Sequence, residues 1–116
     1  MHPIVLKAVE DQQFSNPVPV GQPIGEPIAQ ARTAGEYNLQ GTAAETGIWE
    51  CTPGSFRRGI KEAEYSYIIS GDGSFTPDGG EPLAFRSGDT LCFPPDCQGT
   101  WTIRETVRKS YVIFAR

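Results

Sequence analysis

The chain has 116 residues, of which 38% are hydrophobic and 21% charged, a size and composition that fit one domain with a single hydrophobic core. Ten basic and fourteen acidic residues give a formal net charge of −4, and the short run Arg57-Arg58 is too small to form a nucleic-acid-binding stripe. No apolar run approaches the ~20 residues that a membrane helix needs, and the first residues lack the apolar segment of a signal peptide. The composition therefore argues against nucleic-acid and membrane partners.

The cysteines indicate a reduced setting. Cys51, Cys92 and Cys97 are odd in number, and none belongs to a C-x-x-C pair. We expect the three thiols to act as small hydrophobic side chains in a cytoplasmic protein.

The N-terminal part is predicted to form an extended arm. Residues 16–28, NPVPVGQPIGEPI, carry four prolines and are typical of a non-helical segment. Residues 26–35 could hold one helical turn, because Ala, Gln and Arg tolerate a helix and Gly35 can stop it. The sequence therefore divides into a Pro-rich arm with room for extra strands, residues 1–45, and a main domain, residues 46–116.

The arm also predicts self-association. It is too apolar for a free tail, and a sheet edge of a second copy would cover it. We therefore expect a homodimer, in which the arm contributes the apolar residues Val18, Val20, Ile24 and Ile28.

After the arm, short strand-like segments alternate with turn signals. Gly, Pro and Asp clusters such as Pro53-Gly54 and Gly71-Asp72-Gly73 separate runs rich in β-branched and aromatic residues. Turns every ~8–12 residues favour an all-β sandwich or a closed barrel, and residues 74–77 and 81–86 would form a hairpin. The expected strands are 46–52, 64–70, 74–77, 81–86, 90–93, 99–105 and 107–115.

The segment FPPDCQGTW, residues 93–101, predicts a rigid corner. Pro94 and Pro95 cannot donate to a sheet, so they should end one strand, and Gly99 then allows a backbone position that a side chain would forbid. Such stiff loops often display binding groups.

Four phrases in the second half of the chain resemble the motifs of the cupin superfamily. They are EYSYIISG (64–71), GDTLCFP (88–94), GTW (99–101) and VRKSY (107–111). The wording is most similar to the subgroup related to the cupin domain of ureidoglycine aminohydrolase. The resemblance covers roughly residues 46–115 and implies a cupin-type jelly-roll barrel.

The resemblance also implies that the metal site of this superfamily is degenerate. Metal-binding cupins use three histidines, but the sole histidine of this chain is His2. One carboxylate, Glu64, cannot hold a transition metal, which needs three or four ligands, and we expect no metal and no cofactor. The three histidine positions would fall on Arg58 and Ile60, or on Arg57 and Gly59, and on Gly99.

Strand alternation predicts what the barrel interior holds instead. Glu64 and Ser66 share one face of their strand, and Lys109 shares a face with Tyr111 and Ile113. An inward lysine needs a carboxylate partner, for which Glu62 and Glu64 are the candidates. Such a mixture suits a small polar molecule with carboxylate or ureido groups. The predicted ligand-binding residues are Arg58, Glu64, Tyr67, Cys97, Trp101 and Lys109.

Two other functions stay open. A metal-independent enzyme acting on a ureidoglycine- or sugar-related compound could use Glu64 as base with Lys109 or Tyr67 as acid. A structural or assembly domain would need only the arm and the strand face that carries Tyr65 and Tyr67. In that case Glu64–Lys109 would be a buried ion pair without a binding role, and Trp101 a core residue.

Overall fold

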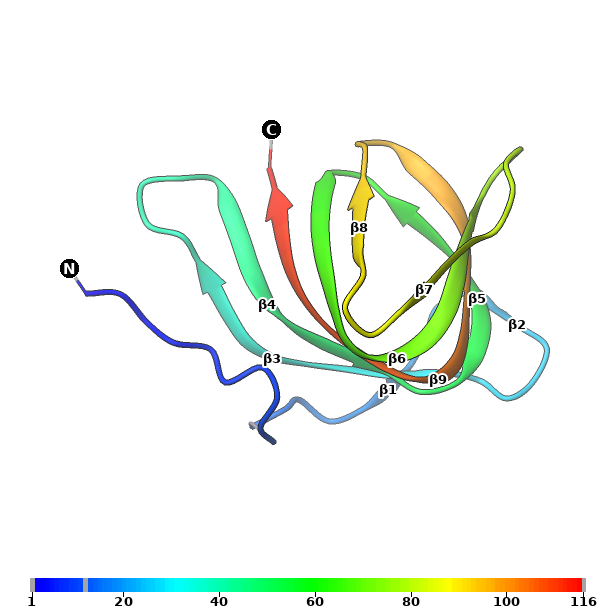
Figure 1. Cartoon of the computed structure of the whole chain (residues 1–116), viewed down its shortest axis with the longest axis horizontal. Coiled ribbons are helices and arrows are strands. Elements are labelled where there is room, and N and C mark those ends of the chain that lie inside the picture. The colour runs from blue at the N-terminus through cyan, green and yellow to red at the C-terminus, as the bar shows by residue number, and fades with distance from the viewer. Residues whose placement is uncertain (1, 12, 116) are drawn as a thin grey trace.

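The computed structural model describes residues 2–11 and 13–115, which fold into nine β-strands and no helix (Figure 1). None of these residues therefore forms a helix that could cross a bilayer. The strands are β1 (Val18–Pro19), β2 (Pro23–Ile24), β3 (Gln30–Asn38), β4 (Ala44–Cys51), β5 (Gly54–Ile60), β6 (Ala63–Pro77), β7 (Leu83–Arg86), β8 (Thr90–Phe93) and β9 (Cys97–Phe114).

All strand pairs are antiparallel and join into one strongly curled sheet. The long strand β9 is its centre, since residues 107–114 pair with β4 and residues 97–103 pair with β5. β6 pairs with β9 over almost its whole length, and β7 and β8 pair with β6. Figure 1 shows β6 and β9 curving together, so that the sheet closes toward a barrel. The prediction of an all-β fold is confirmed.

Trp101 is the centre of the hydrophobic core. Its ring centroid lies 5.3 Å from that of Phe75 and 5.7 Å from those of Trp49, Phe85 and Phe93. The residue is 2% exposed, and the edge-to-face contacts with Phe75 and Phe85 are the arrangement that aromatic rings prefer. Packed aromatic rings therefore form the centre of the core.

Several predicted strands are present where expected. Residues 90–93 form β8, and the predicted strand 46–52 corresponds to β4. The predicted hairpin also exists, because Phe75 of β6 pairs with Leu83 of β7.

The prediction of a turn at Gly71-Asp72-Gly73 is wrong. Residues 64–70 and 74–77 belong to the single strand β6, whose register against β9 shifts in this stretch. Gly71 has a φ of 103°, and a Cβ there would collide with the backbone of Thr106. The glycine therefore bends the strand around the barrel without ending it. The two segments predicted at 99–105 and 107–115 are also a single strand, β9.

Two further assignments are corrected. The helical turn expected in residues 26–35 is absent, because residues from Gln30 onward form β3, which pairs along β4. Weak helix propensity is overridden here by sheet pairing. Arg57 and Arg58, which none of the expected strands included, lie in β5, which pairs with β9.

The proline corner has the expected form. β8 ends at Phe93, the turn carries Pro94 and Pro95, and β9 begins at Cys97. Gly99 is required by space, because a Cβ there would meet the carbonyl of Thr76 and the ring of Phe75.

The Pro-rich arm packs on its own chain. β1 pairs with β3, and β2 pairs with β5. These arm residues therefore pair with sheet edges of their own chain and not with those of a second copy. The homodimer stays a prediction.

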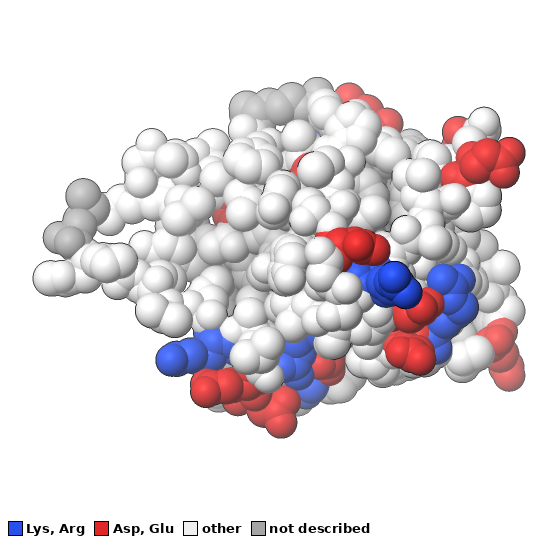
Figure 2. Space-filling view, in the orientation of Figure 1, with Lys and Arg blue, Asp and Glu red and all other residues white. Residues whose placement is uncertain are grey.

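Surface charges are mixed in sign. Figure 2 shows basic and acidic side chains intermingled along one side of the visible face. Two such contacts are exposed ion pairs, Arg57–Asp78 and Arg104–Asp72, with nitrogen–oxygen distances of 2.6 Å. Pairs of this kind neutralise one another locally and contribute little to stability.

Candidate ligand-binding cavity

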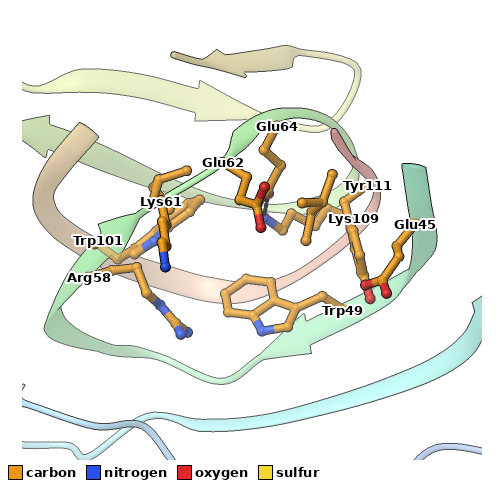
Figure 3. Close-up of a pocket in the computed structure, with 12 residues that line it drawn as sticks. Glu45, Trp49, Arg58, Lys61, Glu62, Glu64, Trp101, Lys109 and Tyr111 are labelled. Carbon is orange, nitrogen blue, oxygen red and sulfur yellow. Dashed lines mark hydrogen bonds and ion pairs between the residues drawn. The ribbon is translucent and has the colours of Figure 1, made fainter. Parts of the chain in front are cut away.

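An open cavity of about 390 Å³ lies between β4, β5, β6 and β9 (Figure 3). Its volume falls in the range of small-molecule sites. Exposed side chains such as Arg58 and Lys61 stand at its mouth, and the buried Trp101 and Lys109 form its inner wall. The lining residues are Glu45, Trp49, Arg58, Gly59, Ile60, Lys61, Glu62, Glu64, Trp101, Lys109, Tyr111 and Ile113.

Period-two alternation explains most of this lining. Lys109, Tyr111 and Ile113 are every second residue of β9 and face the cavity together. Glu45 and Trp49 are likewise on one face of β4. Because Trp49 pairs with Lys109 across the two strands, the indole lies directly beside the lysine.

Lys109 is the centre of a buried polar network. Its Nζ donates to Glu64 Oε2 at 2.7 Å and to Ser66 Oγ at 3.0 Å, and Ser66 Oγ donates to the same Glu64 oxygen at 2.7 Å. The side chains of Lys109 and Glu64 are only 7% and 11% exposed. Of the two candidate partners, Glu62 and Glu64, it is therefore Glu64 that forms the predicted ion pair.

Aromatic rings surround the ammonium group. Its Nζ lies 4.9 Å from the ring centroid of Trp49, 5.1 Å from that of Trp101 and 5.9 Å from that of Phe93, which are cation–π distances. Burial lowers the pKa of Lys109, whereas the Glu64 carboxylate opposes this effect. The network thus keeps a cation in an environment that otherwise disfavours charge.

Tyr111 lies on β9, two residues after Lys109, and stands beside Glu45 (Figure 3). Burial, together with the carboxylates of Glu36, Glu64 and Glu45, raises the pKa of Tyr111 to about 12. The phenol is therefore neutral at physiological pH and can donate a hydrogen bond.

The cavity brings together four of the six residues predicted as ligand contacts, namely Arg58, Glu64, Trp101 and Lys109. Tyr67 is not among its lining residues, since it lies on the outer face of β6 and is 43% exposed. Cys97 is also outside the lining and packs against the hydrophobic core. The structure does not bring these two residues into the cavity: Tyr67 alternates away from Glu64, and Cys97 lies at the start of β9 opposite Ile60.

Sequence reasoning missed several cavity residues. Trp49 and Glu45 were not among the predicted contacts, and Tyr111 was noted only as sharing the face of Lys109. Alternation along β4 links Glu45 to Trp49, but the curl of the sheet that brings β4 across from Glu64 has no local signal in the sequence.

The residues present do not fit a transition metal. No group of three or more His, Cys, Asp or Glu side chains occurs among residues 2–11 and 13–115. Of the expected histidine positions, Arg58 and Ile60 line the cavity, whereas the place of a side chain at Gly99 is taken by Phe75. Glu64 is already bonded to Lys109. The chemistry of the cavity is therefore that of its own side chains.

The curled antiparallel sheet, with a cavity lined by both charged and aromatic side chains, defines a barrel of the cupin type. Residues 39–111 match the EutQ-like cupin domain family, and the chain belongs to this family. No functionally curated protein matches the sequence.

Solved structures agree with this assignment. A protein of unknown function from Pseudomonas syringae pv. tomato, of the DUF861 family, is 25% identical with a TM-score of 0.77; the match covers 93% of this chain and 46% of that one. This chain thus spans about half the length of the Pseudomonas protein. A DUF861 family protein from Thermotoga maritima is 31% identical over 58% of this chain and 76% of that chain, with a TM-score of 0.56.

The EutQ protein of Clostridium difficile shares the fold. It is 19% identical with a TM-score of 0.65, and the match covers 74% of this chain and 68% of the EutQ chain. The narrower resemblance to the ureidoglycine aminohydrolase subgroup stays a prediction.

Proposed function

We propose that the protein binds a small polar molecule, carrying a carboxylate or ureido group, in the cavity of the barrel. The observation that carries this proposal is the Lys109–Glu64–Ser66 network, which lines a cavity of about 390 Å³ that is open to solvent. A buried ion pair is seldom needed for stability, because apolar residues of similar volume often serve as well. Its position at the wall of a cavity supports a role in binding.

One acceptor atom of the network, Glu64 Oε1, is left for a ligand, and a ureido or amide N–H could donate to it. Both hydrogen bonds to Glu64 end on Oε2, and none within the described part of the chain ends on Oε1. Arg58 at the mouth offers the planar donor fork that pairs with carboxylates, and Trp49 offers a flat apolar surface.

A thermal-shift screen with small carboxylates, ureides and sugars tests the proposal. We expect at least one compound to raise the melting temperature in a dose-dependent way, since a ligand that binds the folded state stabilises it. Arg58→Gln should weaken this effect. Arg57→Gln is the matched control, because Arg57 precedes it in β5 but pairs with Asp78 outside the cavity. Loss of the shift in both variants, or in neither, would contradict a site at Arg58.

A metal-independent enzyme acting on ureidoglycine- or sugar-related compounds is the second candidate. The observation in its favour is the burial of Lys109, which lowers the pKa of a proton donor held beside the carboxylate of Glu64. Tyr67 is too far outside the cavity to serve as the acid. Mass spectrometry of the ureides and sugars after incubation should reveal turnover that Glu64→Gln abolishes; unchanged compounds would exclude this candidate.

We also propose that the protein forms a homodimer through its arm. Val18, Ile24 and Ile28 remain exposed although β1 and β2 pair within the chain. Light scattering at micromolar concentration should give twice the chain mass, and Ile24→Ser should reduce it. A monomer mass for the unmodified protein would refute the dimer.

A further inference from the structure

Two charged side chains that line the cavity are not neutralised by an ion pair. Among the described residues, Arg58 and Glu45 take part in none of the salt bridges, whereas Lys109 and Glu64 neutralise each other. Lys61 and Glu62, which also line the cavity, have interactions of their own. Arg58 and Glu45 therefore offer a ligand one guanidinium and one carboxylate that no salt bridge within the described residues engages.

Arg58 and Glu45 stand on opposite walls of the cavity. Arg58 comes from β5 and Glu45 from β4, and Figure 3 shows the Trp49 indole on the floor between them. They do not form an ion pair with each other. A ligand that satisfies both must therefore extend across the indole.

The electrostatic effects on neighbouring groups agree with this polarity. Arg58 contributes to lowering the pKa of Lys109, as a positive charge does. On the opposite wall, Glu45 contributes to raising the pKa of Tyr111, with Glu36 and Glu64 acting in the same direction. One end of the cavity is thus positive and the other negative.

We propose that the ligand is an elongated zwitterion, with a carboxylate at one end bound by Arg58 and a cationic ammonium or guanidinium at the other end bound by Glu45. This inference rests on the function proposed above and specifies the class of ligand. The connecting carbon chain lies over Trp49, whose ring face suits methylene groups. An α-amino acid with an uncharged side chain carries both charged groups on one carbon, so it can pair with Arg58 or with Glu45 but not with both.

A set of matched compounds tests the inference by calorimetry. The zwitterions are 3-aminopropanoate, 4-aminobutanoate, 5-aminopentanoate and 6-aminohexanoate. For the five-carbon compound, pentanoate lacks the cation, pentylamine lacks the anion, and 2-aminopentanoate carries both charges at one end. Analogues of the same chain length are used for whichever zwitterion of the series binds best. We expect this zwitterion to bind at least about five-fold more tightly than its three analogues, since each exposed charge pair contributes modestly to the binding free energy.

Variants locate each end of the ligand. Glu45→Gln should reduce the affinity for the zwitterion to that of the matched carboxylate, while leaving the carboxylate itself bound as before. Arg58→Gln should lower the affinity for both the zwitterion and the carboxylate. Arg57→Gln and Glu81→Gln, at positions outside the cavity lining, serve as controls and should change the affinity for neither compound.

The outcomes separate the two proposals. If the carboxylate binds as tightly as the zwitterion, or if Glu45→Gln changes nothing, the zwitterion is excluded while small-molecule binding stands. If none of these compounds binds but another compound of the broader screen does, the zwitterion is again excluded. If no compound binds at all, both proposals are overturned.

Discussion

Two adjacent residues of β9 form polar clusters on opposite faces of the same sheet. Arg108 pairs with Glu50 on the outer face, and Lys109 pairs with Glu64 on the inner face. On β4, the neighbours are also consecutive, because Glu50 faces Arg108 and Trp49 faces Lys109. The same two strands therefore build two charged sites that differ in what surrounds them.

The outer cluster fastens the N-terminal segment. Arg108 donates to Glu50 Oε2 at 2.7 Å and to the backbone carbonyl of Glu10 at 3.1 Å, and its guanidinium lies 5.0 Å from the ring centroid of Phe14. Arg32 also binds Glu50 and stacks on the same ring at 4.1 Å. Every charge has several partners within the chain, as suits a structural clamp.

The inner cluster is less complete. Lys109 has two hydrogen-bond acceptors, Glu64 and Ser66, and aromatic rings around it, and an open cavity lies beside it. The comparison teaches that the arginine site is saturated by its own chain, whereas the lysine site leaves room for another molecule. We therefore assign structure to the outer face and propose binding for the inner one.

The largest expected effect is the loss of one partner of the inner pair. Lys109→Met or Glu64→Gln leaves a buried group without its partner, which typically costs about 3–5 kcal/mol of unfolding free energy. The double variant should recover part of this loss. Chemical denaturation of the four proteins provides the measurement. Additive effects of the single substitutions would show that Lys109 and Glu64 are not coupled.

The inner face should also control alkaline stability. Burial raises the pKa of the Cys51 thiol from its usual value of 9.0 to about 12. A pKa raised in the folded state gives stability that is fully present below pH 9 and is lost as the pH rises toward 12. Relative to the wild type, Cys51→Ala should therefore lose less stability over this window in thermal melts. Parallel pH profiles of the two proteins would contradict the assigned cause.

Disruption of the outer cluster should have a smaller effect. Arg108→Met removes the bonds to Glu50 and to the N-terminal segment, but Glu50 keeps Arg32 as its partner. We expect a loss of about 1–2 kcal/mol, in line with a few hydrogen bonds to a charged group. Hydrogen exchange should increase in residues 8–14 and not around the cavity. Equal exchange in both regions would mean that the two clusters are not independent.

The smallest effect is expected at the exposed pair Arg57–Asp78. Its side chains are 35% and 54% exposed, so solvent screens the interaction. Arg57→Gln should leave the melting temperature unchanged within error. A clear decrease would show that an exposed ion pair contributes substantially to the stability of this protein.

The sequence allowed the inner pair to be predicted, but not the whole cavity. Side chains alternate between the two faces of a strand, which depends on local strand geometry alone. This alternation places Glu64 and Ser66 on one face of β6 and predicts that Lys109 of β9 also points inward. The opposition of Glu45 to Arg58 depends on how far the sheet curls, which involves strands distant in sequence. Likewise, the glycines at 71 and 73 bend β6 without ending it, and only the pairing partner β9 distinguishes these outcomes.

The central claim is that the inner pair serves binding more than stability. Calorimetry on the double variant Glu64→Gln/Lys109→Met, with the compound that most stabilises the wild-type protein in the thermal screen, tests it most directly. The account predicts that the double variant is folded, with part of its stability regained, yet binds this compound at least about ten-fold more weakly, because the polar groups of the ligand lose their partners. Unchanged affinity in a folded double variant would contradict the claim.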